Sequence, residues 1–332
     1  MTEPVDAVIT WVDGGDPAHR RKLDAYLASL GCPRPATADP TRFSDEGELA
    51  WCLASIVRFA PWFRRIWIVS DDQRPALLDT LRGTPWETRV RLVDHRTLFA
   101  GLEDCLPTFN SRSISCLFWR IPGIAERHVY FNDDFVLLQP VQPGDFFRDD
   151  GVVVRGRWER QAHRRWSKRL ARMLGSRRQS DASPTESRAQ DLSARLAGFD
   201  RRCFRLEHCP YPMRRSTLAD YFAANPALLR ETVAHRLRHP AQLRPESLAT
   251  HLEFAAGRAQ ADERLKLVHL KPSRQPAWRV RAKLERAGRD PQAAFACVQS
   301  LDEAEPAMRD ALRGWLDARV GTLAAAVETA PG

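Results

Sequence analysis

The chain has 332 residues, of which 28% are charged and 43% are hydrophobic, and its formal net charge is +9. This balance is typical of a globular protein, and it excludes a disordered tail protein, a collagen-like chain and a coiled coil. The length suits about two domains, or one α/β domain with an insertion, and is sufficient to bury a core without disulfides.

The first part of the chain alternates short apolar runs with helical patterns. Strands are predicted at residues 5–12, 65–70, 90–93 and 129–138, and helices at residues 45–59, at residues 111–120 and in a segment that has Pro17 in its first turn. Such alternation is typical of a mostly parallel sheet flanked by helices. We therefore expect an α/β, Rossmann-like or GT-A-like catalytic core in residues 1–150, followed by a helical insertion or subdomain.

A basic segment follows in residues 151–190. Ten basic residues and one acid, Glu159, lie between Arg155 and Arg178, with Trp158 and Trp166 among them. Three interpretations remain open for this segment: an interfacial helix on an anionic membrane surface, a lid that attracts a phosphate-bearing acceptor, and a solvated arm.

The remainder is predicted to return to the core. Residues 192–257 show helical patterns and no convincing strand, which predicts a helical subdomain in residues 191–260 that completes the active site. Within residues 261–332, strands at 266–270 and 293–298 are expected to rejoin the sheet. A closing helix is expected at 307–320, with Leu312, Trp315 and Leu316 on one face.

The seven cysteines indicate reduced thiols, because their number is odd and no CxxC pair occurs. Cys203 and Cys209 flank His208, but two thiols at this spacing are more typical of small buried residues than of a zinc site. No signal peptide and no apolar run of membrane-spanning length is visible. We expect a cytoplasmic protein, either free or peripheral on the inner face of the membrane.

Acidic clusters lie where predicted strands end. They are Asp13 with Asp16, Asp71 with Asp72, and Asp133 with Asp134. Ligands of open α/β sheets bind beyond the carboxyl ends of the strands. Adjacent carboxylates in an apolar segment are costly unless a cation or hydrogen-bond donors neutralise them, and oxygen ligands suit Mg²⁺, Mn²⁺ or Ca²⁺. The alternative is a set of polar turns whose Asp side chains cap the following helices.

Several common catalytic motifs are missing from the sequence. It contains no GxxxxGK[ST], GxGxxG, GxSxG or HExxH pattern. P-loop, dinucleotide-binding, serine-hydrolase and zinc-protease functions therefore have no support.

The order of several motifs resembles the Stealth family. Its first region is matched by residues 6–16. Its second region is matched by residues 42–49, 60–62, 66–73, 93–95, 106–111, 120–123 and 130–134. The third region is matched less closely, by residues 208–210 and 235–239, and the fourth around residues 297–302.

This resemblance implies a function. Stealth proteins include capsular and cell-wall polysaccharide phosphotransferases, which move a sugar-1-phosphate from a nucleotide-sugar to a hydroxyl group. The resemblance implies that the donor is a nucleotide-sugar, typically linked to UDP in this family, which gives up a hexose-1-phosphate and releases the nucleoside monophosphate. It also implies a divalent cation, Mg²⁺ above all, and a glycan acceptor that is lipid-linked in some systems. No nucleic-acid partner is implied, and no oligomeric state is predicted.

The resemblance also assigns roles to residues. The metal ligands would be Asp134 and Asp133, and the catalytic residues would be Asp133, His208 and Arg238, with Asp133 or His208 as the proton acceptor. Substrate would be bound by Thr10, Trp11, Asp13, Gly14, Asp16, Arg42, Asp71, Gln73, Asn110, Ser111 and Asn132. Arg238 and Arg42 are the candidates that clamp phosphate oxygens.

Other interpretations of these residues stay open. Asp13 and Asp16 also suit a turn, Asp71 suits a helix cap, and Arg236 or Arg244 would replace Arg238 if the match shifts. The chain also departs from the family pattern at Ser115, at Trp119 and at residues 239–241. The first two departures leave the donor sugar open, and the third weakens the match to the third region.

Two other functions are compatible with parts of the sequence. An ordinary metal-dependent glycosyltransferase would use the same fold but attack the anomeric carbon and release UDP. A basic nucleic-acid-binding protein would bind through the segment 155–178 in a salt-sensitive manner. The nucleic-acid function gives no account of the acidic strand ends.

Overall fold

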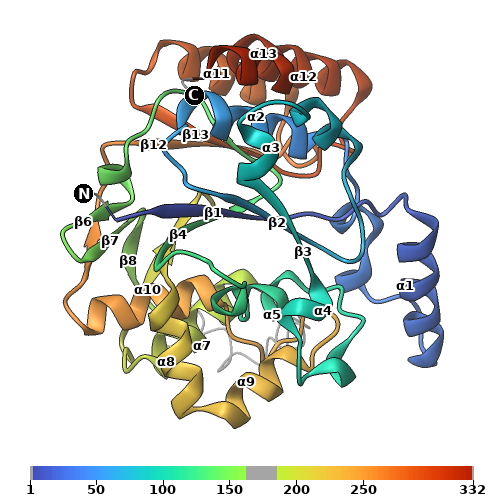
Figure 1. Cartoon of the computed structure of the whole chain (residues 1–332), viewed down its shortest axis with the longest axis vertical. Helices are drawn as coiled ribbons and strands as arrows, with labels where there is room; N and C mark the ends of the chain where they lie inside the picture. Colours follow the sequence, from blue (N-terminus) through green and yellow to red (C-terminus); the bar gives the residue numbers. More distant parts are fainter. Residues whose placement is uncertain (1–2, 162–184, 331–332) are drawn as a thin grey trace, which may run out of the picture.

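The computed structural model describes residues 3–161 and 185–330. A central sheet lies between two layers of helices (Figure 1), with the strand order β10-β4-β1-β2-β3. Its parallel strands are β1 (Val5–Thr10), β2 (Ile66–Ser70), β3 (Val90–Asp94) and β4 (Arg127–Asn132), and β10 (Tyr211–Arg214) runs antiparallel to β4. The predicted α/β class with a mostly parallel sheet is therefore confirmed.

Strands β1, β2 and β4 are buried on both faces, as their apolar sequences predict, whereas Arg91 and Leu92 of the edge strand β3 are exposed. Ala7, Val8 and Ile9 of β1 are fully buried. The one acid in this strand, Asp6, is also buried, and it is neutralised by Arg64 at 2.7 Å. In the register of the sheet Thr10 lies opposite Asn132, so β1 and β4 end together at one edge. That shared edge brings the polar residues that follow both strands into one place.

Helices cover both faces of the sheet (Figure 1). One layer contains α2 (Glu48–Phe59), α3 (Trp86–Arg89), α11 (Ala277–Arg289), α12 (Pro306–Val320) and α13 (Leu323–Thr329). The other contains α4 (His95–Leu98), α5 (Ser111–Ser115), α7 (Glu186–Leu196), α8 (Arg215–Ala224), α9 (Pro226–Val233) and α10 (Pro245–Ala255). Helix α1 (Pro17–Ser29) projects at the side.

The predicted closing helix is confirmed as α12. Its Leu312 and Leu316 are buried, and Trp315 is partly buried against the core. None of the described helices is both long enough and apolar enough to span a bilayer.

The expectation that both C-terminal strands rejoin the main sheet is wrong. Strands β12 (Lys266–Leu270) and β13 (Ala293–Val298) form a separate sheet with β5 (Phe135–Leu137), in the order β12-β13-β5. The turn at residues 133–134 directs the chain out of the main sheet after β4, and β13 then pairs with β5. Asp133 and Asp134 therefore lie at the junction of two sheets.

The expectation that residues 192–257 contain no strand is also wrong. Besides β10, they contain β9 (Arg202–Leu206), which pairs with β8 (Gly156–Arg160). Just beyond them, β11 (Ala259–Ala261) joins β6 (Phe147–Arg148) and β7 (Gly151–Val154). Strands β8 and β9 are short and contain two arginines each, so their alternation carries little apolar signal. Tertiary pairing rather than local sequence defines them.

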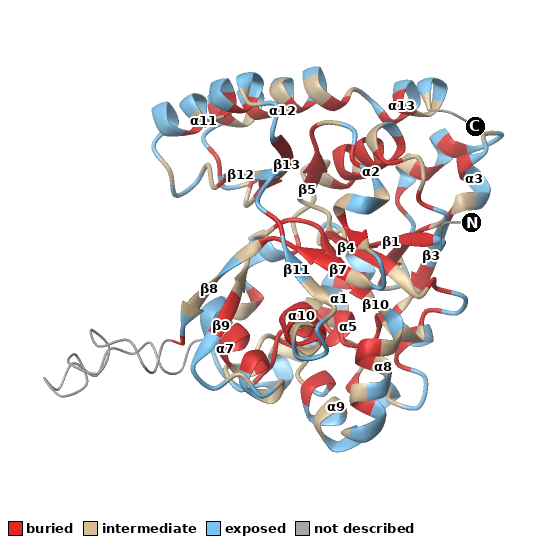
Figure 2. Ribbon diagram, turned by 90° about the vertical axis from the view of Figure 1, so that its left-hand side faces the viewer, coloured by how far each residue is buried: buried red, intermediate tan, exposed pale blue. Residues whose placement is uncertain are grey.

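The structure describes only the two ends of the basic segment, residues 151–161 and 185–190. Arg155 is buried, with its guanidinium 4.6 Å from the centre of the Phe295 ring. Trp158 packs against Phe204 and Phe254 in the region where β8 and β9 meet (Figure 2). These residues are part of the folded core rather than of an arm. Trp166 and the rest of residues 162–184 lie outside the described residues, so the three interpretations of that stretch stay predictions.

Candidate active site

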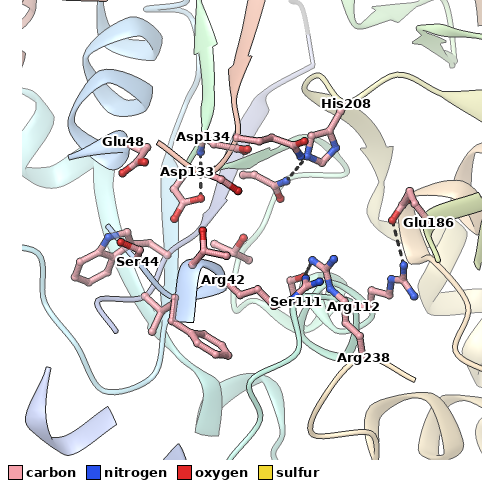
Figure 3. Close-up of a pocket in the computed structure, with 18 of the residues that line it drawn as sticks. Arg42, Ser44, Glu48, Ser111, Arg112, Asp133, Asp134, Glu186, His208 and Arg238 are labelled. Carbon is pink, nitrogen blue, oxygen red and sulfur yellow. Dashed lines mark hydrogen bonds and ion pairs between the residues drawn. The ribbon is translucent and has the colours of Figure 1, made fainter. Parts of the chain in front are cut away.

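A large cavity of about 1020 Å³ opens at the carboxyl edge of the central sheet. Its lining comes from the ends of β1 and β4, from the start of α2, α5 and α7, and from loops that lie far apart in the sequence. Glu48, Asp133 and Asp134 lie on one side of it (Figure 3), and Arg112 and Arg238 lie on the other, with Glu186 beside them. The volume is at the upper end of the range for small-molecule sites, so a large ligand fits.

The acidic wall contains Asp133 and Asp134, which follow β4 directly, and Glu48, which begins α2. The turn is held by a hydrogen bond from the Asp134 amide to Asp133 Oδ1 at 3.1 Å. Burial raises the pKa of Asp134 to about 6 and that of Glu48 to about 8. Burial and the neighbouring Asp134 raise the pKa of Asp133 well above its ordinary value. Full ionisation of these three carboxyl groups is therefore unfavourable in the absence of a cation.

These residues fit a divalent cation. Asp134 Oδ1 is buried and has no hydrogen-bond partner among the described residues. A buried oxygen without a partner, beside a second carboxylate, is a combination that a bound cation would relieve. Asp133 and Asp134 could supply the oxygen ligands that Mg²⁺ prefers.

The basic wall is organised around Glu186 at the start of α7. Its carboxylate forms ion pairs with Arg112 of α5 and with Arg244, which precedes α10. Both arginine side chains are buried, whereas Glu186 is about half exposed. Arg244 and Arg112 hold the pKa of Glu186 well below its ordinary value, because a carboxylate between two guanidinium groups is favoured in its charged form. Glu186 therefore stays ionised and fixes two guanidinium groups at the cavity wall.

Arg238 joins this wall through Ser111. Its Nη2 donates to Ser111 Oγ at 3.0 Å. Burial lowers the pKa of Arg238, and the nearby Arg42 guanidinium adds to the effect. Clustered cations without a matching number of acids are typical of an anion-binding surface, and arginine suits phosphate oxygens in particular.

A chain of hydrogen bonds connects the end of β1 to a histidine. The Thr10 hydroxyl lies 3.0 Å from the Tyr130 hydroxyl, which donates to Asn132 Oδ1 at 2.6 Å. The Asn132 amide nitrogen then faces His208 Nε2 at 3.4 Å, and His208 Nδ1 lies 2.9 Å from the Tyr211 hydroxyl. Because an amide nitrogen only donates, this network assigns the ring proton to Nδ1 and a free electron pair to Nε2.

His208 is held neutral by its surroundings. Burial lowers the pKa of His208 well below its ordinary value, and Arg244 adds to the effect. Its ring packs edge-on against Phe135, with the ring centres 4.8 Å apart. A neutral, oriented imidazole beside a cavity is suited to accepting a proton from a bound hydroxyl group.

The structure brings together most of the predicted site. The predicted residues that line the cavity are Thr10, Trp11, Arg42, Ser111, Asn132, Asp133, Asp134, His208 and Arg238. Asp13, Gly14, Asp16, Asp71, Gln73 and Asn110 do not belong to the lining. Their roles as substrate ligands stay predictions, and the contacts that these residues make in the structure shape a turn or hold neighbouring elements together.

The turn after β1 is shaped by its own acids. Asp16 Oδ1 accepts from His19 N at 2.8 Å and caps α1, and Asp13 Oδ1 accepts from Gly15 N at 2.7 Å. Gln73 Nε2 donates to the Asp13 carbonyl oxygen at 2.9 Å, and the Asp13 amide donates to Gln73 Oε1 at 3.0 Å. These contacts agree with the interpretation of this segment as a structural turn.

Asp71 and Asn110 hold neighbouring elements in place. Asp71 pairs with Lys22 at 3.0 Å, and the donors around it lower its pKa to about 2 although burial opposes this. It does not cap a helix, because Pro75 precedes the next helical turn. Asn110 is fully buried and caps α5 by accepting from Arg112 N.

Sequence reasoning missed several residues of the site. Glu48 lies within the matched residues 42–49 and Arg112 directly follows the matched residues 106–111, so a closer examination of these motifs would have included both. Glu186 and Tyr211 carry no local signal, because their role depends on partners far away in the chain. Of the two alternatives to Arg238, Arg244 lines the cavity, whereas Arg236 contacts the Asp104 carbonyl and the Tyr26 ring outside it.

A thiol also lies beside the acidic wall. Cys297 of β13 is fully buried, and its Sγ lies 3.3 Å from Asp134 Oδ2. Donor atoms of Asp134, His208 and Cys297 all lie within 4.8 Å of one another. Cys203 and Cys209, the pair that flanks His208 in the sequence, are buried free thiols, which agrees with their structural interpretation.

Comparison with known proteins identifies two family regions. Residues 3–31 match the model of Stealth protein conserved region 1, and residues 42–155 match that of conserved region 2. Exopolysaccharide phosphotransferase SCO6021 of Streptomyces coelicolor is 36% identical over 266 residues, which are 77% of this chain and 44% of that protein. Capsular polysaccharide phosphotransferase WcwK of Streptococcus pneumoniae is 30% identical over 257 residues, which are 71% of this chain and 74% of that protein.

The chain spans less than half the length of the Streptomyces relatives that it matches, at 44% of one and 41% of another. Among solved structures, mouse xyloside xylosyltransferase 1 aligns with 89% of this chain and 97% of that one, with a TM-score of 0.42 and 12% identity. That likeness is too distant to support an assignment.

Proposed function

The chain belongs to the Stealth protein family, and on this premise we propose that it transfers a hexose-1-phosphate from a nucleotide-sugar to a hydroxyl group of a glycan. The product is a phosphodiester within a capsular or cell-wall polysaccharide, and a nucleoside monophosphate, UMP for a UDP-linked donor, is released. The acceptor oxygen forms a bond to the phosphorus that carries the sugar. The bond from this phosphorus to the bridging diphosphate oxygen breaks, and the sugar keeps its anomeric bond.

One observation carries this proposal: two carboxylates face a cluster of arginines across a single cavity. Transfer of a phosphoryl group depends mainly on positioning and on neutralising charge. Arg238 lies beside Ser111 at the cavity wall, and Arg112 and Arg244 are held by Glu186. These guanidinium groups suit the oxygens of a diphosphate.

Asp134, together with Asp133, is the proposed holder of a divalent cation, Mg²⁺ by preference. The ion would supply positive charge that offsets the charge of the diphosphate. The raised pKa of both carboxyl groups and the unpartnered Asp134 Oδ1 support this assignment.

His208 is the proposed acceptor of the proton that the attacking hydroxyl group loses. Its Nε2 carries the free electron pair, while Tyr211 holds Nδ1 at 2.9 Å. Asp133 is the alternative acceptor, since its raised pKa makes it a stronger base than an ordinary carboxylate. His208→Gln separates the two, because it leaves both proposed ligands of the cation in place: a large loss of kcat at saturating substrate supports His208 as the acceptor, and an unchanged kcat supports Asp133.

Identification of the released nucleotide tests the function. The chain is incubated with a panel of nucleotide-sugars, Mg²⁺ and glycan acceptors, and the nucleotide products are separated by chromatography. Release of UMP from a UDP-sugar supports phosphotransfer, whereas release of UDP supports an ordinary glycosyltransferase instead. Asp134→Asn should abolish turnover while the protein remains folded, and wild-type rates in that variant would refute the role of Asp134.

We also propose that the acceptor is presented on a lipid, with the chain bound peripherally to the cytoplasmic face of the membrane. The support is the basic composition of residues 155–178 and the nature of the acceptor. Flotation with vesicles that contain anionic phospholipid tests this, using the full chain and a variant in which the basic residues between 162 and 178 are replaced by Gln. Equal flotation of the two proteins would contradict it.

A further inference from the structure

The donor atoms around Asp134 are of three chemical types. Asp134 supplies a carboxylate oxygen, His208 an imidazole nitrogen and Cys297 a thiol sulfur, all within 4.8 Å of one another. These residues come from the turn after β4, from the loop before β10 and from β13. The three segments are distant in sequence, so the cluster arises only from the fold. Its donor set differs from the oxygen-only pair of Asp133 and Asp134.

The geometry is close to that of a tetrahedral metal site. With the usual bonds of zinc to sulfur, nitrogen and oxygen, ligand atoms lie roughly 3.3–3.8 Å apart. Cys297 Sγ and Asp134 Oδ2 are already 3.3 Å apart. The His208 donor atom lies within 4.8 Å of both, so it has to move toward them to complete the set, and the contact of Nε2 with the Asn132 amide, at 3.4 Å, is the one that this movement gives up.

The surroundings also favour a bound ion. The Tyr211 hydroxyl holds His208 Nδ1 at 2.9 Å, which leaves Nε2 as the ligand atom and fixes the plane of the ring. Asp134 Oδ1 is buried without a hydrogen-bond partner among the described residues. Asp134 and His208 line the cavity, so the fourth position of a tetrahedral ion would open toward it.

We propose that Asp134, His208 and Cys297 form a site for a divalent ion that prefers thiolate ligands, with Zn²⁺ as the representative ion. Binding converts the Cys297 thiol to a thiolate and releases one proton to water, and the sulfur then bonds to the ion. Thiolate and imidazole donors select such ions over Mg²⁺. The consequence for activity rests on the proposed function. An ion bound at this site occupies His208, the proposed proton acceptor, and Asp134, the proposed Mg²⁺ ligand, so zinc inhibits transfer.

Cobalt spectroscopy tests the site without reference to activity. Co²⁺ replaces Zn²⁺ in tetrahedral sites, and a bond to sulfur produces a charge-transfer band in the near ultraviolet. The wild-type chain with one equivalent of Co²⁺ should show this band, and Cys297→Ser should lack it. Two controls should keep it: Cys52→Ser, a buried thiol 3.7 Å from the Asn132 carbonyl oxygen, and Cys32→Ser, an exposed thiol.

Each result decides the proposal. Loss of the band in Cys297→Ser, with an unchanged circular dichroism spectrum, supports it. A band that persists in Cys297→Ser, or a wild-type spectrum with oxygen ligands only, overturns it. If Cys297→Ser does not fold, His208→Gln provides the second test, because it keeps the thiol but should weaken Co²⁺ binding at least about tenfold.

Inhibition is measured separately under excess Mg²⁺. Each protein is compared with its own rate in the absence of zinc, and Cys297→Ser should need at least about tenfold more Zn²⁺ for half-inhibition than the wild type. Equal sensitivity of the two proteins would overturn the inhibitory role. If the protein binds Co²⁺ through sulfur but releases no nucleotide, the metal site is supported and the proposed function is contradicted. Failure of the metal-site proposal is therefore distinguishable from failure of the proposed function.

Discussion

The Tyr211 hydroxyl and His208 Nδ1 lie 2.9 Å apart, and this contact fixes which nitrogen of the histidine faces the cavity. Arg244 Nη2 also donates to the Tyr211 hydroxyl, at 2.5 Å. The basic wall and the proposed proton acceptor are therefore coupled through one buried phenol.

Tyr211→Phe removes the hydroxyl and keeps the ring. We expect kcat to fall by about 10- to 100-fold, as for other groups that orient a functional histidine, with a smaller change in the KM for the donor. We also expect a loss of stability of about 1–3 kcal/mol, because a buried guanidinium nitrogen and the His208 ring nitrogen lose their partner. Steady-state kinetics and urea unfolding measure the two effects. A rise of about 10- to 100-fold in the KM for the donor with an unchanged kcat would contradict a positioning role.

Asp134→Asn should stabilise the protein in the absence of metal ions at neutral and alkaline pH. Burial raises the pKa of Asp134 from 3.8 to about 6. The folded state thus binds this proton more tightly than the unfolded state, so stability falls as the pH rises between these two values and stays low above about 6. The variant escapes this loss, which is about 1–3 kcal/mol.

Thermal unfolding in chelator at about pH 4 and pH 8 checks this sign. The variant should be more stable than the wild type at the higher pH, and the gap should shrink at the lower pH. Asp16→Asn is the control, because the pKa of Asp16 is lowered by hydrogen bonds from the backbone of α1, and its removal should stabilise at neither pH. A wild type that is the more stable protein at pH 8 would contradict the prediction.

Addition of Mg²⁺ should raise the Tm of the wild type and leave that of Asp134→Asn nearly unchanged. An ion that binds only the folded state stabilises it by an amount that grows with the logarithm of its concentration, about 2.7 kcal/mol at 100 times its Kd. Scanning calorimetry over a series of Mg²⁺ concentrations measures the shift. Equal shifts in both proteins would place the ion elsewhere.

Arg238 and Arg236 form a matched pair for testing the basic wall. Arg238→Ala should lower kcat/KM for the nucleotide-sugar by about 10- to 100-fold, which corresponds to about 1.4–2.7 kcal/mol. Arg236→Ala removes the same charge two residues away, where the side chain contacts the Asp104 carbonyl rather than the cavity, and should change kcat/KM by about twofold at most. Similar losses in both variants would indicate a long-range charge effect instead of a contact.

Asn110 and Ser111 are adjacent but should respond differently. Asn110→Ala removes a helix cap and two buried donors, to the His235 carbonyl at 2.8 Å and to Gln242 Oε1 at 2.9 Å, and should cost about 2–4 kcal/mol of stability. Ser111→Ala removes only the cavity-facing hydroxyl that accepts from Arg238, and should raise the donor KM with little change in Tm. Unfolding curves and donor kinetics for both variants provide the comparison, which fails if Asn110→Ala is as stable as the wild type.

The parts of the fold that follow from local sequence were predictable. Strands β1 and β2 are rich in apolar and β-branched residues, and this composition predicts burial on both faces. The helix that begins at Pro17 is predicted by the Asp16 cap and by proline in its first turn. Strands β8 and β9 escaped prediction because their residues alternate with arginines, whose aliphatic stems and cation–π contacts, as between Arg202 and Trp158, replace an apolar pattern. The C-terminal strands were found, but their sheet was not, since pairing with β5 depends on a change of direction at the Asp133–Asp134 turn.

The sequence by itself determined the paired carboxylates of Asp133 and Asp134, because their cost beside the apolar end of β4 is a local property. It also determined the order of the motifs that mark the family. Only the tertiary structure decided what faces them: Glu186 holding Arg112 and Arg244, Tyr211 holding His208, and Cys297 beside Asp134. Those contacts join residues that no spacing rule connects, since they exist only where two sheets and the helix layers converge on one edge.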